Sequence, residues 1–208
     1  MKSKILVGTA LLFSISAMQS CSDNPSESNN NKKGMDSSMN HMGKSDSMHA
    51  GKMKMTGDFD YDFATTMIAH HQTAIDMAKV EMSKGSNAAM KSMAEGIVKA
   101  QEAEIGQFKA ILKEYKMPEM KKEGGEMHNE LGEIMEKMET KMKGMALSGN
   151  ADKDFAMMMV PHHESAVAMA EDELSHGKNL ALKQMAQKII EDQSNEIKEF
   201  QQWLGKNK

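Results

Sequence analysis

The sequence predicts an all-α protein, an antiparallel four-helix bundle built from two repeated αα-hairpins with a methionine-rich helix between them. Three observations support this prediction. Aromatic residues make up only 4% of the 208 residues and β-branched residues are few, so the chain lacks the side chains that sheets favour. Beyond residue 58, apolar residues recur with a helical period. The same stretch repeats itself at an offset of 92 residues, which indicates a duplicated structural unit.

Residues 1–20 are predicted to be a lipoprotein signal peptide. Two lysines precede an apolar run from Ile5 to Met18, which is too short to span a bilayer and fits a secretory signal. Cys21 follows in a setting that resembles a bacterial lipobox, with Met18 where that motif usually has leucine. We therefore expect a lipid on the Cys21 thiol that anchors the protein in the bacterial cell envelope, on the periplasmic or cell-surface side. A plain signal peptide followed by an incidental cysteine is the alternative.

The charge balance argues against a nucleic-acid partner. The formal net charge is −4, and all 26 positive side chains are lysine because the sequence contains no arginine. Removing Lys2 and Lys4 with the leader leaves 24 lysines against 30 acidic residues, a net charge of −6. Such a chain repels a polyanion and lacks the side chain best suited to bidentate phosphate contacts.

Residues 21–57 are predicted to form a disordered tether that collects metal ions. Serine, asparagine, lysine and glycine dominate this stretch, and such a composition cannot bury enough apolar surface to offset chain entropy. Low-complexity drift explains the serine and asparagine, but not the choice of methionine over every other large apolar residue. The potential metal ligands of the tether are Met35, Met39, His41, Met42, Met48, His49, Met53 and Met55.

The bundle domain is predicted to span residues 58–205, with repeat 1 at 58–116, a connector at 117–151 and repeat 2 at 152–205. Each repeat has two apolar-periodic segments separated near Gly85 or Gly177. We expect these glycines to close the preceding helices in the left-handed conformation. Identical residues 92 positions apart include Asp62 and Asp154, Glu81 and Glu173, Ile97 and Ile189, and Phe108 and Phe200.

The connector contains a further helical candidate at residues 126–145, after the helix breakers Pro118 and Gly124-Gly125. Four methionines at spacings of three and four share one face of this helix. Such a face can pack against the bundle or bind metal, and the sequence favours neither use. These methionines are Met135, Met138, Met142 and Met145.

The duplicated histidine pairs are the strongest functional signal. On a helix they fall on the apolar stripe of their repeat, where leucine, isoleucine and alanine would normally lie. A buried imidazole needs a hydrogen-bond partner or a metal ion, because an unpaired polar group is costly in a core. We therefore expect the pairs to converge with flanking thioethers on a metal. The candidate ligands are Met67, His70, His71, Met77, Met158, Met159, His162, His163 and Met169.

The second segment of each repeat offers polar partners for these histidines. Gln101 and Glu104, with Gln193 and Glu196 in the second repeat, lie on the same apolar stripe as isoleucine and phenylalanine. They can accept hydrogen bonds that fix the histidine tautomers, or ligate a metal directly.

Ligand softness selects the metal. Thioether sulfur holds Cu(I) and Ag(I) well and hard cations poorly, while imidazole serves Cu(I), Cu(II) and zinc. Copper, held as Cu(I), is therefore the expected ion, with Ag(I) as a second candidate. An exported protein of this kind would act in copper sequestration, buffering or resistance, with a copper efflux or chaperone protein as its partner.

Two sequence segments carry a resemblance to a known family. Residues 63–78, FATTMIAHHQTAIDMA, and residues 155–170, FAMMMVPHHESAVAMA, resemble the domain of unknown function 305 family. That resemblance implies a ferritin-like helical bundle of an exported bacterial protein, and some members look like periplasmic copper-binding proteins of the CopM type. Pro161, directly before His162, departs from the first repeat. We expect it to kink its helix and make the two half-sites unequal.

Two other functions stay open at this point. A di-iron carboxylate oxidase needs two Glu-x-x-His motifs, but only Glu173-Leu-Ser-His176 has that spacing, since Lys84 replaces histidine in the first repeat. A metal-free structural or interaction module is the third reading, in which the histidines merely hydrogen-bond to Glu104 and Glu196.

Overall fold

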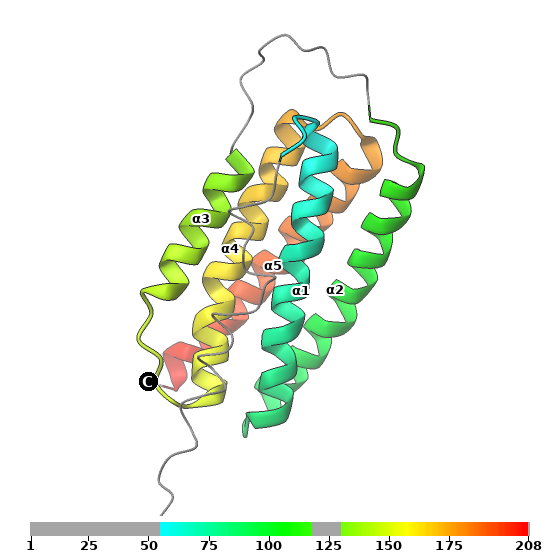
Figure 1. Ribbon diagram of the computed structural model, residues 1–208. Helices are drawn as coiled ribbons and strands as arrows, with labels where there is room; N and C mark the ends of the chain where they lie inside the picture. Colours follow the sequence, from blue (N-terminus) through cyan, green and yellow to red (C-terminus); the bar gives the residue numbers. More distant parts are fainter. Residues whose placement is uncertain (1–54, 118–129, 208) are drawn as a thin grey trace, which may run out of the picture. The chain divides into compact units, whose positions relative to one another are not determined.

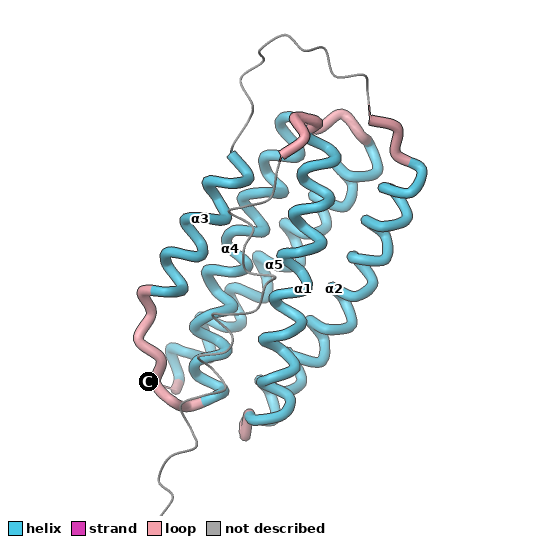
Figure 2. The backbone as a smooth tube through the Cα atoms, viewed as in Figure 1, coloured by secondary structure: helices cyan, strands magenta, loops and turns pink. Residues whose placement is uncertain are grey.

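The computed structural model describes residues 55–117 and 130–207, all of which belong to a single unit that spans residues 35–208. These described residues form five α-helices and no β-strand (Figures 1 and 2). The helices are α1 (Phe59–Lys84), α2 (Ala88–Glu114), α3 (Glu130–Lys143), α4 (Ala151–His176) and α5 (Leu180–Lys206). The all-α prediction is therefore confirmed.

Four of the helices form the expected antiparallel bundle. The α1–α2 and α4–α5 hairpins have helices of 26 and 27 residues in each case, and α1 packs against α4 to join them. The shorter helix α3 lies along α4 on the outside of the bundle (Figure 1). The connector helix runs from Glu130 to Lys143, within the range of 126–145 expected from its sequence, and Met145 lies beyond its end.

The helices begin at side chains that satisfy their first free N–H groups. Asp58 accepts from the Tyr61 amide at the start of α1, and Asn150 accepts from the Lys153 amide at the start of α4. Asn87 begins α2 in the same way that Asn179 begins α5. Equivalent caps 92 residues apart extend the sequence repeat into the turns.

Two aspartates lock the hairpins together. Asp60, in the first turn of α1, accepts from the Lys178 and Asn179 amides in the α4–α5 turn at 2.8 Å. Asp152, in the first turn of α4, accepts from the Ser86 and Asn87 amides at 2.9 and 2.8 Å. Each hairpin therefore caps the turn of the other, which fixes α1 and α4 as antiparallel neighbours.

The two hairpin glycines correct a detail of the sequence prediction. Gly85 and Gly177 do end α1 and α4, but with φ of −64° and −62° they are extended, not left-handed. Glycine is needed here because the carboxyl of a buried glutamate lies against the turn. A Cβ on Gly85 would stand 2.1 Å from Oε1 of Glu81, and one on Gly177 would stand 2.2 Å from Oε1 of Glu173.

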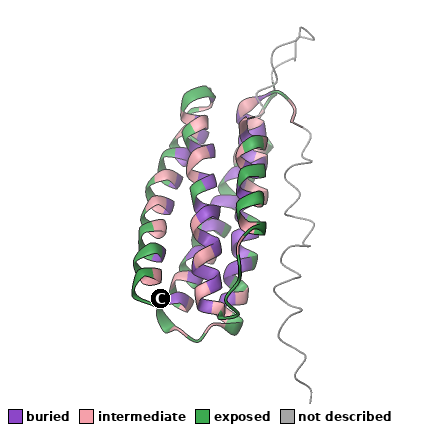
Figure 3. Cartoon of the chain, turned by 90° about the vertical axis from the view of Figure 1, so that its left-hand side faces the viewer, coloured by how far each residue is buried: buried purple, intermediate pink, exposed green. Residues whose placement is uncertain are grey.

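The core consists of two apolar clusters, and the buried faces of the helices turn toward each other (Figure 3). We call them the Phe63 cluster and the Phe155 cluster. Buried methionines contribute to both, since their flexible thioethers fill irregular gaps. The Phe63 cluster includes Phe63, Met67, Phe108, Leu131, Met135, Met138, Met169, Leu182 and Ile189. The Phe155 cluster includes Met77, Met90, Ile97, Phe155, Met158, Met159 and Phe200.

Several predictions fall on residues that the structure does not describe. The signal peptide at 1–20, Cys21 and nearly all of the tether at 21–57 lie outside the described ranges. The last three tether residues are described, and the Thr56 and Gly57 amides donate to Asp62 at 2.9 to 3.0 Å.

Pro161 lies inside α4, which continues unbroken from Ala151 to His176.

Candidate metal centre

Four histidines lie in the middle of the bundle. His70 and His71 come from α1, His162 and His163 come from α4, and each is at most 1% exposed. The rings of His70 and His162 face each other with centroids 3.7 Å apart, whereas neighbours within each pair stand 6.3 and 6.1 Å apart. The fold thus brings the two sequence pairs into one layer, with His70 and His162 as the inner pair.

The inner pair is poorly satisfied by the protein's own groups. Three of its four ring nitrogens, Nδ1 of His70 and both nitrogens of His162, have no hydrogen-bond partner. The pKa values of His70 and His162 lie well below 6.5, mainly because both rings are buried and secondly because other histidines lie close by. A contact with the backbone of the opposite histidine raises each pKa, but by less than the other two effects lower it. Both rings are therefore neutral near pH 7, and neutral imidazoles have lone pairs available for a metal.

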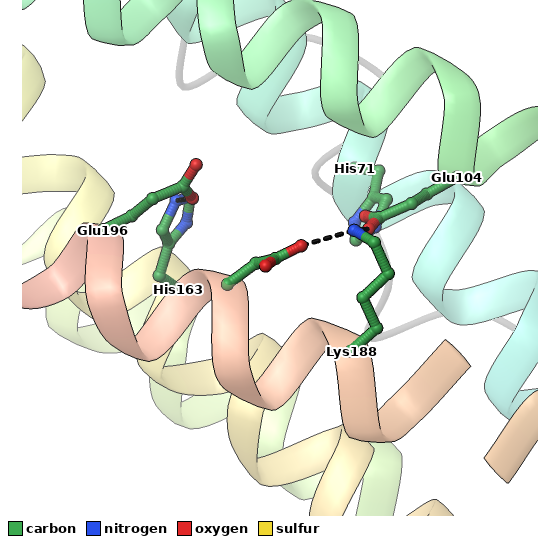
Figure 4. Close-up of polar contacts among 6 residues, drawn as sticks. His71, Glu104, His163, Lys188 and Glu196 are labelled. Atoms are coloured by element: carbon green, nitrogen blue, oxygen red, sulfur yellow. Dashed lines mark hydrogen bonds and ion pairs between the residues drawn. The ribbon is translucent and has the colours of Figure 1, made fainter. Parts of the chain in front are cut away.

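His71 of the outer pair is held by a carboxylate. Its Nε2 donates to Glu104 on α2 at 2.9 Å, and the other Glu104 oxygen accepts from Lys188 on α5 at 3.0 Å (Figure 4). Burial alone would raise the pKa of Glu104, but the contacts with His71 and Lys188 hold it below its ordinary value. Because an ionised carboxylate only accepts, this contact requires a proton on Nε2 of His71.

The second half of the layer resembles the first but is looser. Glu196 on α5 lies 2.8 Å from Nε2 of His163, yet its side chain is 27% exposed, against 7% for Glu104. Gly96 occupies the position equivalent to Lys188, so no lysine holds Glu196 from there. Figure 4 shows this difference, with Lys188 beside only one of the two histidine–glutamate pairs.

The predicted glutamines have a different position from the glutamates. Gln101 and Gln193 are buried, at 2% and 3% exposure, but their amide atoms have no hydrogen-bond partner. Four polar residues on α2 and α5 were predicted as partners of the histidines. Glu104 and Glu196 make these polar contacts in the structure, whereas Gln101 and Gln193 do not.

The candidate methionines divide between the two apolar clusters. Met67 of α1 and Met169 of α4 belong to the Phe63 cluster, and Met77, Met158 and Met159 belong to the Phe155 cluster. Antiparallel packing of α1 against α4 explains this division. Methionines that precede the histidine pair on one helix lie at the same level as methionines that follow the pair on the other helix. Each outer histidine contacts one of these clusters. His71 lies beside Phe108 of the Phe63 cluster, and His163 lies beside Phe200 of the Phe155 cluster, with ring centroids 6.0 Å apart in each case.

Two contacts of the histidine layer were not predicted from the sequence. The Ser165 hydroxyl on α4 lies 2.7 Å from Nε2 of His70 and 3.0 Å from the sulfur of Met138 on α3. Lys188 likewise had no place in the sequence prediction. For Ser165 a signal existed, because the equivalent position in repeat 1 is Thr73, another hydroxyl side chain on the histidine helix.

Nitrogen and carboxylate ligands do not gather into a metal cluster in the described part of the chain. Within residues 55–117 and 130–207, no group of three or more His, Cys, Asp or Glu side chains is arranged to hold a metal ion. The core does contain unpartnered imidazole nitrogens and buried thioethers, which are soft, neutral donors. Such donors suit a monovalent soft ion, which brings little charge into a dry core.

The Glu-x-x-His motif at the end of α4 does not face a common site. Glu173 is fully buried, whereas the His176 side chain is 40% exposed and its ring lies 5.4 Å from that of Phe59. The geometry therefore gives the di-iron hypothesis no paired ligand set at this position.

The histidine-centred bundle is the fold of a known family. The sequence profile of the family described as "Domain of unknown function (DUF305)" matches residues 9–112 and 60–204, so the chain belongs to this family. No curated protein matches the chain.

Solved structures of the family are similar to this chain. The structure titled "CopM in the Cu(I)-bound form" has 30% sequence identity and a TM-score of 0.54, with 71% of this chain and 96% of that chain covered. CopM in its Ag-bound form by co-crystallisation has 28% identity, a TM-score of 0.53 and the same coverage. A DUF305 protein from Streptomyces coelicolor, with 20% identity, a TM-score of 0.56 and coverage of 73% and 95%, shares the fold.

Proposed function

We propose that this chain is an exported bacterial protein that binds Cu(I), and Ag(I) as its analogue, at the histidine layer of its bundle. The observation that carries the proposal is the inner pair, two buried imidazoles whose ring centroids lie 3.7 Å apart at a tilt of 37° and which have three unpartnered nitrogens. An unsatisfied buried polar atom costs about 1–3 kcal/mol, so a metal-free core would keep this arrangement at a considerable loss. A metal that binds these nitrogens removes that loss.

The proposed ligands are the four core histidines with methionines from the two clusters. Likeness to CopM, whose solved forms hold Cu(I), Cu(II) and Ag, supports copper as the cargo. Glu104 and Glu196 would orient the outer imidazoles, because a histidine ligand usually donates its other N–H to a carboxylate.

Location and cellular role extend the proposal. None of the helices among the described residues is long and apolar enough to cross a membrane. The signal peptide and lipobox-like Cys21 support a lipid-anchored place in the cell envelope. There the protein would sequester or buffer copper, with the Met- and His-rich tether as a collecting arm and an efflux or chaperone protein as recipient.

Metal binding and a metal-free core make opposite predictions for a thermal melt. A ligand that binds only the folded state at 100 times its Kd adds about 2.7 kcal/mol, which raises Tm by about 5–10 °C for a domain of this size. We expect that shift with Cu(I) under reducing, anaerobic conditions. The double variant His70→Ala/His162→Ala should lose it, and His176→Ala, at the exposed end of α4, should keep it.

Circular dichroism of each variant checks that the helices remain. An unchanged Tm of the wild-type chain at saturating Cu(I) would favour the metal-free module instead. Retention of the tight Cu(I) fraction by a folded His70→Ala/His162→Ala variant would overturn the inner pair as the metal site.

A further inference from the structure

Helix α3 lies outside the sequence repeat, yet one of its methionines reaches the histidine layer. Met138 is 7% exposed, and its sulfur lies 3.0 Å from Oγ of Ser165. That same hydroxyl is 2.7 Å from Nε2 of His70 and 2.6 Å from the carbonyl oxygen of His162. A single hydroxyl group therefore separates the Met138 thioether from the imidazole of His70, whose ring centroid lies 3.7 Å from that of His162.

Met138 differs in this contact from its neighbour on the same face of α3. Its sulfur accepts from the Ser165 hydroxyl at 3.0 Å. Met135, one turn earlier, is similarly buried, at 5% exposure, and belongs to the Phe63 cluster. Packing alone therefore explains Met135, whereas Met138 joins the cluster and also touches the polar layer.

Repeat 1 has no equivalent of this arrangement. The counterpart of Ser165 is Thr73, whose hydroxyl donates to the Ala69 carbonyl at 3.3 Å, and Nε2 of His162 has no partner. Helix α3 packs along α4, so it adds sulfur to one side of the histidine layer. The asymmetry comes from the connector helix.

We propose, building on the proposed function, that Met138 is a metal ligand, and that it completes a site of two nitrogens and one sulfur with His70 and His162. The ion would enter between Nε2 of His70 and the Met138 sulfur, where the Ser165 hydroxyl now lies. The Ser165 hydroxyl would turn out of this gap, and the ion would replace its contacts with His70 and Met138. His70 would present the Nε2 lone pair with its single proton on Nδ1, and the bond to the metal would have to outweigh the cost of that unpartnered N–H.

This donor set prefers soft metal ions to harder ones. A thioether is neutral and polarisable, so with two neutral imidazoles it favours Cu(I) or Ag(I) over Zn²⁺, which gains more from thiolate or carboxylate ligands. Since all three donors are neutral, the bound site carries only the single charge of the ion. The ligand class is therefore a monovalent d¹⁰ cation.

Methyl-labelled methionine tests the assignment in the full chain. With ¹³C in every methionine methyl group, Ag(I) is added in steps up to one equivalent and followed by NMR, with Met138→Leu and Met135→Leu spectra assigning the two signals. We expect the Met138 signal and the histidine ring signals to shift together, while the Met135 signal stays in place. Leucine has a similar volume, so both variants should keep the fold.

Affinity for Ag(I), measured by competition with a chelator, gives the second readout. Met138→Leu should weaken the tightest site by about 10- to 100-fold, and Met135→Leu should match the wild type within about twofold. If the histidine signals move but the Met138 signal does not, and Met138→Leu binds like the wild type, the ligand assignment is overturned while the proposed function stands. If no histidine signal moves in the wild type, both fail.

Discussion

Replacing Gly85 by alanine should destabilise the protein strongly, although alanine favours helices. The new Cβ would stand 2.1 Å from Oε1 of Glu81 and 2.6 Å from the Glu81 carbonyl oxygen, where contacts below 3.0 Å do not occur. Glu81 is 1% exposed, so its carboxyl cannot move into water without disturbing the packing. Overpacking of this kind costs about 1–3 kcal/mol.

The expected loss is therefore about 1–3 kcal/mol, or a Tm lower by roughly 2–12 °C for a domain of ~150 residues. Thermal and urea unfolding of the metal-free protein, followed by circular dichroism, measure it. Gly96→Ala is the matched control, because no atom lies within 4 Å of its new Cβ in the middle of α2. That change should stabilise the helix by about 0.5–1 kcal/mol.

A double-mutant cycle separates the clash from other effects. In a Glu81→Ala background, part of the cost of Gly85→Ala should disappear, because the carboxyl contacts are gone while the 2.6 Å contact with the Glu81 carbonyl oxygen remains. The reasoning is refuted if Gly85→Ala is as harmless as Gly96→Ala. It is also refuted if the cost is unchanged in the Glu81→Ala background.

Two further predictions concern the buried carboxyl groups. Burial, and then the neighbouring Asp60, raise the pKa of Glu173 from 4.5 to about 9. The folded state thus keeps a proton that the unfolded state releases. The contribution of Glu173 to the free energy of unfolding is therefore complete below pH 4.5, and it falls by up to ~1.4 kcal/mol per pH unit as the pH rises toward 9. Glu173→Gln should flatten this decline in urea titrations, and an equal slope in both proteins would count against it. In the metal-free protein, Glu104→Gln should lower the free energy of unfolding by about 1.5–3 kcal/mol, and Glu196→Gln by less than about 1 kcal/mol. The reason is that only Glu104 is both buried and paired with Lys188. Equal losses of the two variants in urea unfolding would contradict the inferred asymmetry.

The broken symmetry of the histidine layer has a functional consequence. Glu104 is fixed between His71 and Lys188, while Glu196 is more exposed and has no lysine opposite it in the repeat. If the proposed site forms, His71 would therefore be oriented by a more buried carboxylate with two partners, and His163 by a more exposed one.

The sequence by itself determined the secondary structure and the duplicated plan of this protein. Helical periodicity, capping residues and the 92-residue repeat act locally or between identical segments, so they can be read without coordinates. The same pattern put His70, His71, His162 and His163 on buried faces, because apolar stripes must face a core.

Only the tertiary structure decided how these residues meet. Antiparallel packing made His70 and His162 the inner pair and divided the methionines between two clusters, which no spacing within one helix determines. Met138 comes from a helix outside the repeat, and Lys188 stands where the first repeat has Gly96, so the symmetry of the sequence conceals both contacts. The extended conformation of Gly85 follows from a glutamate carboxyl packed against the turn, and such a close approach exists only once the chain is folded.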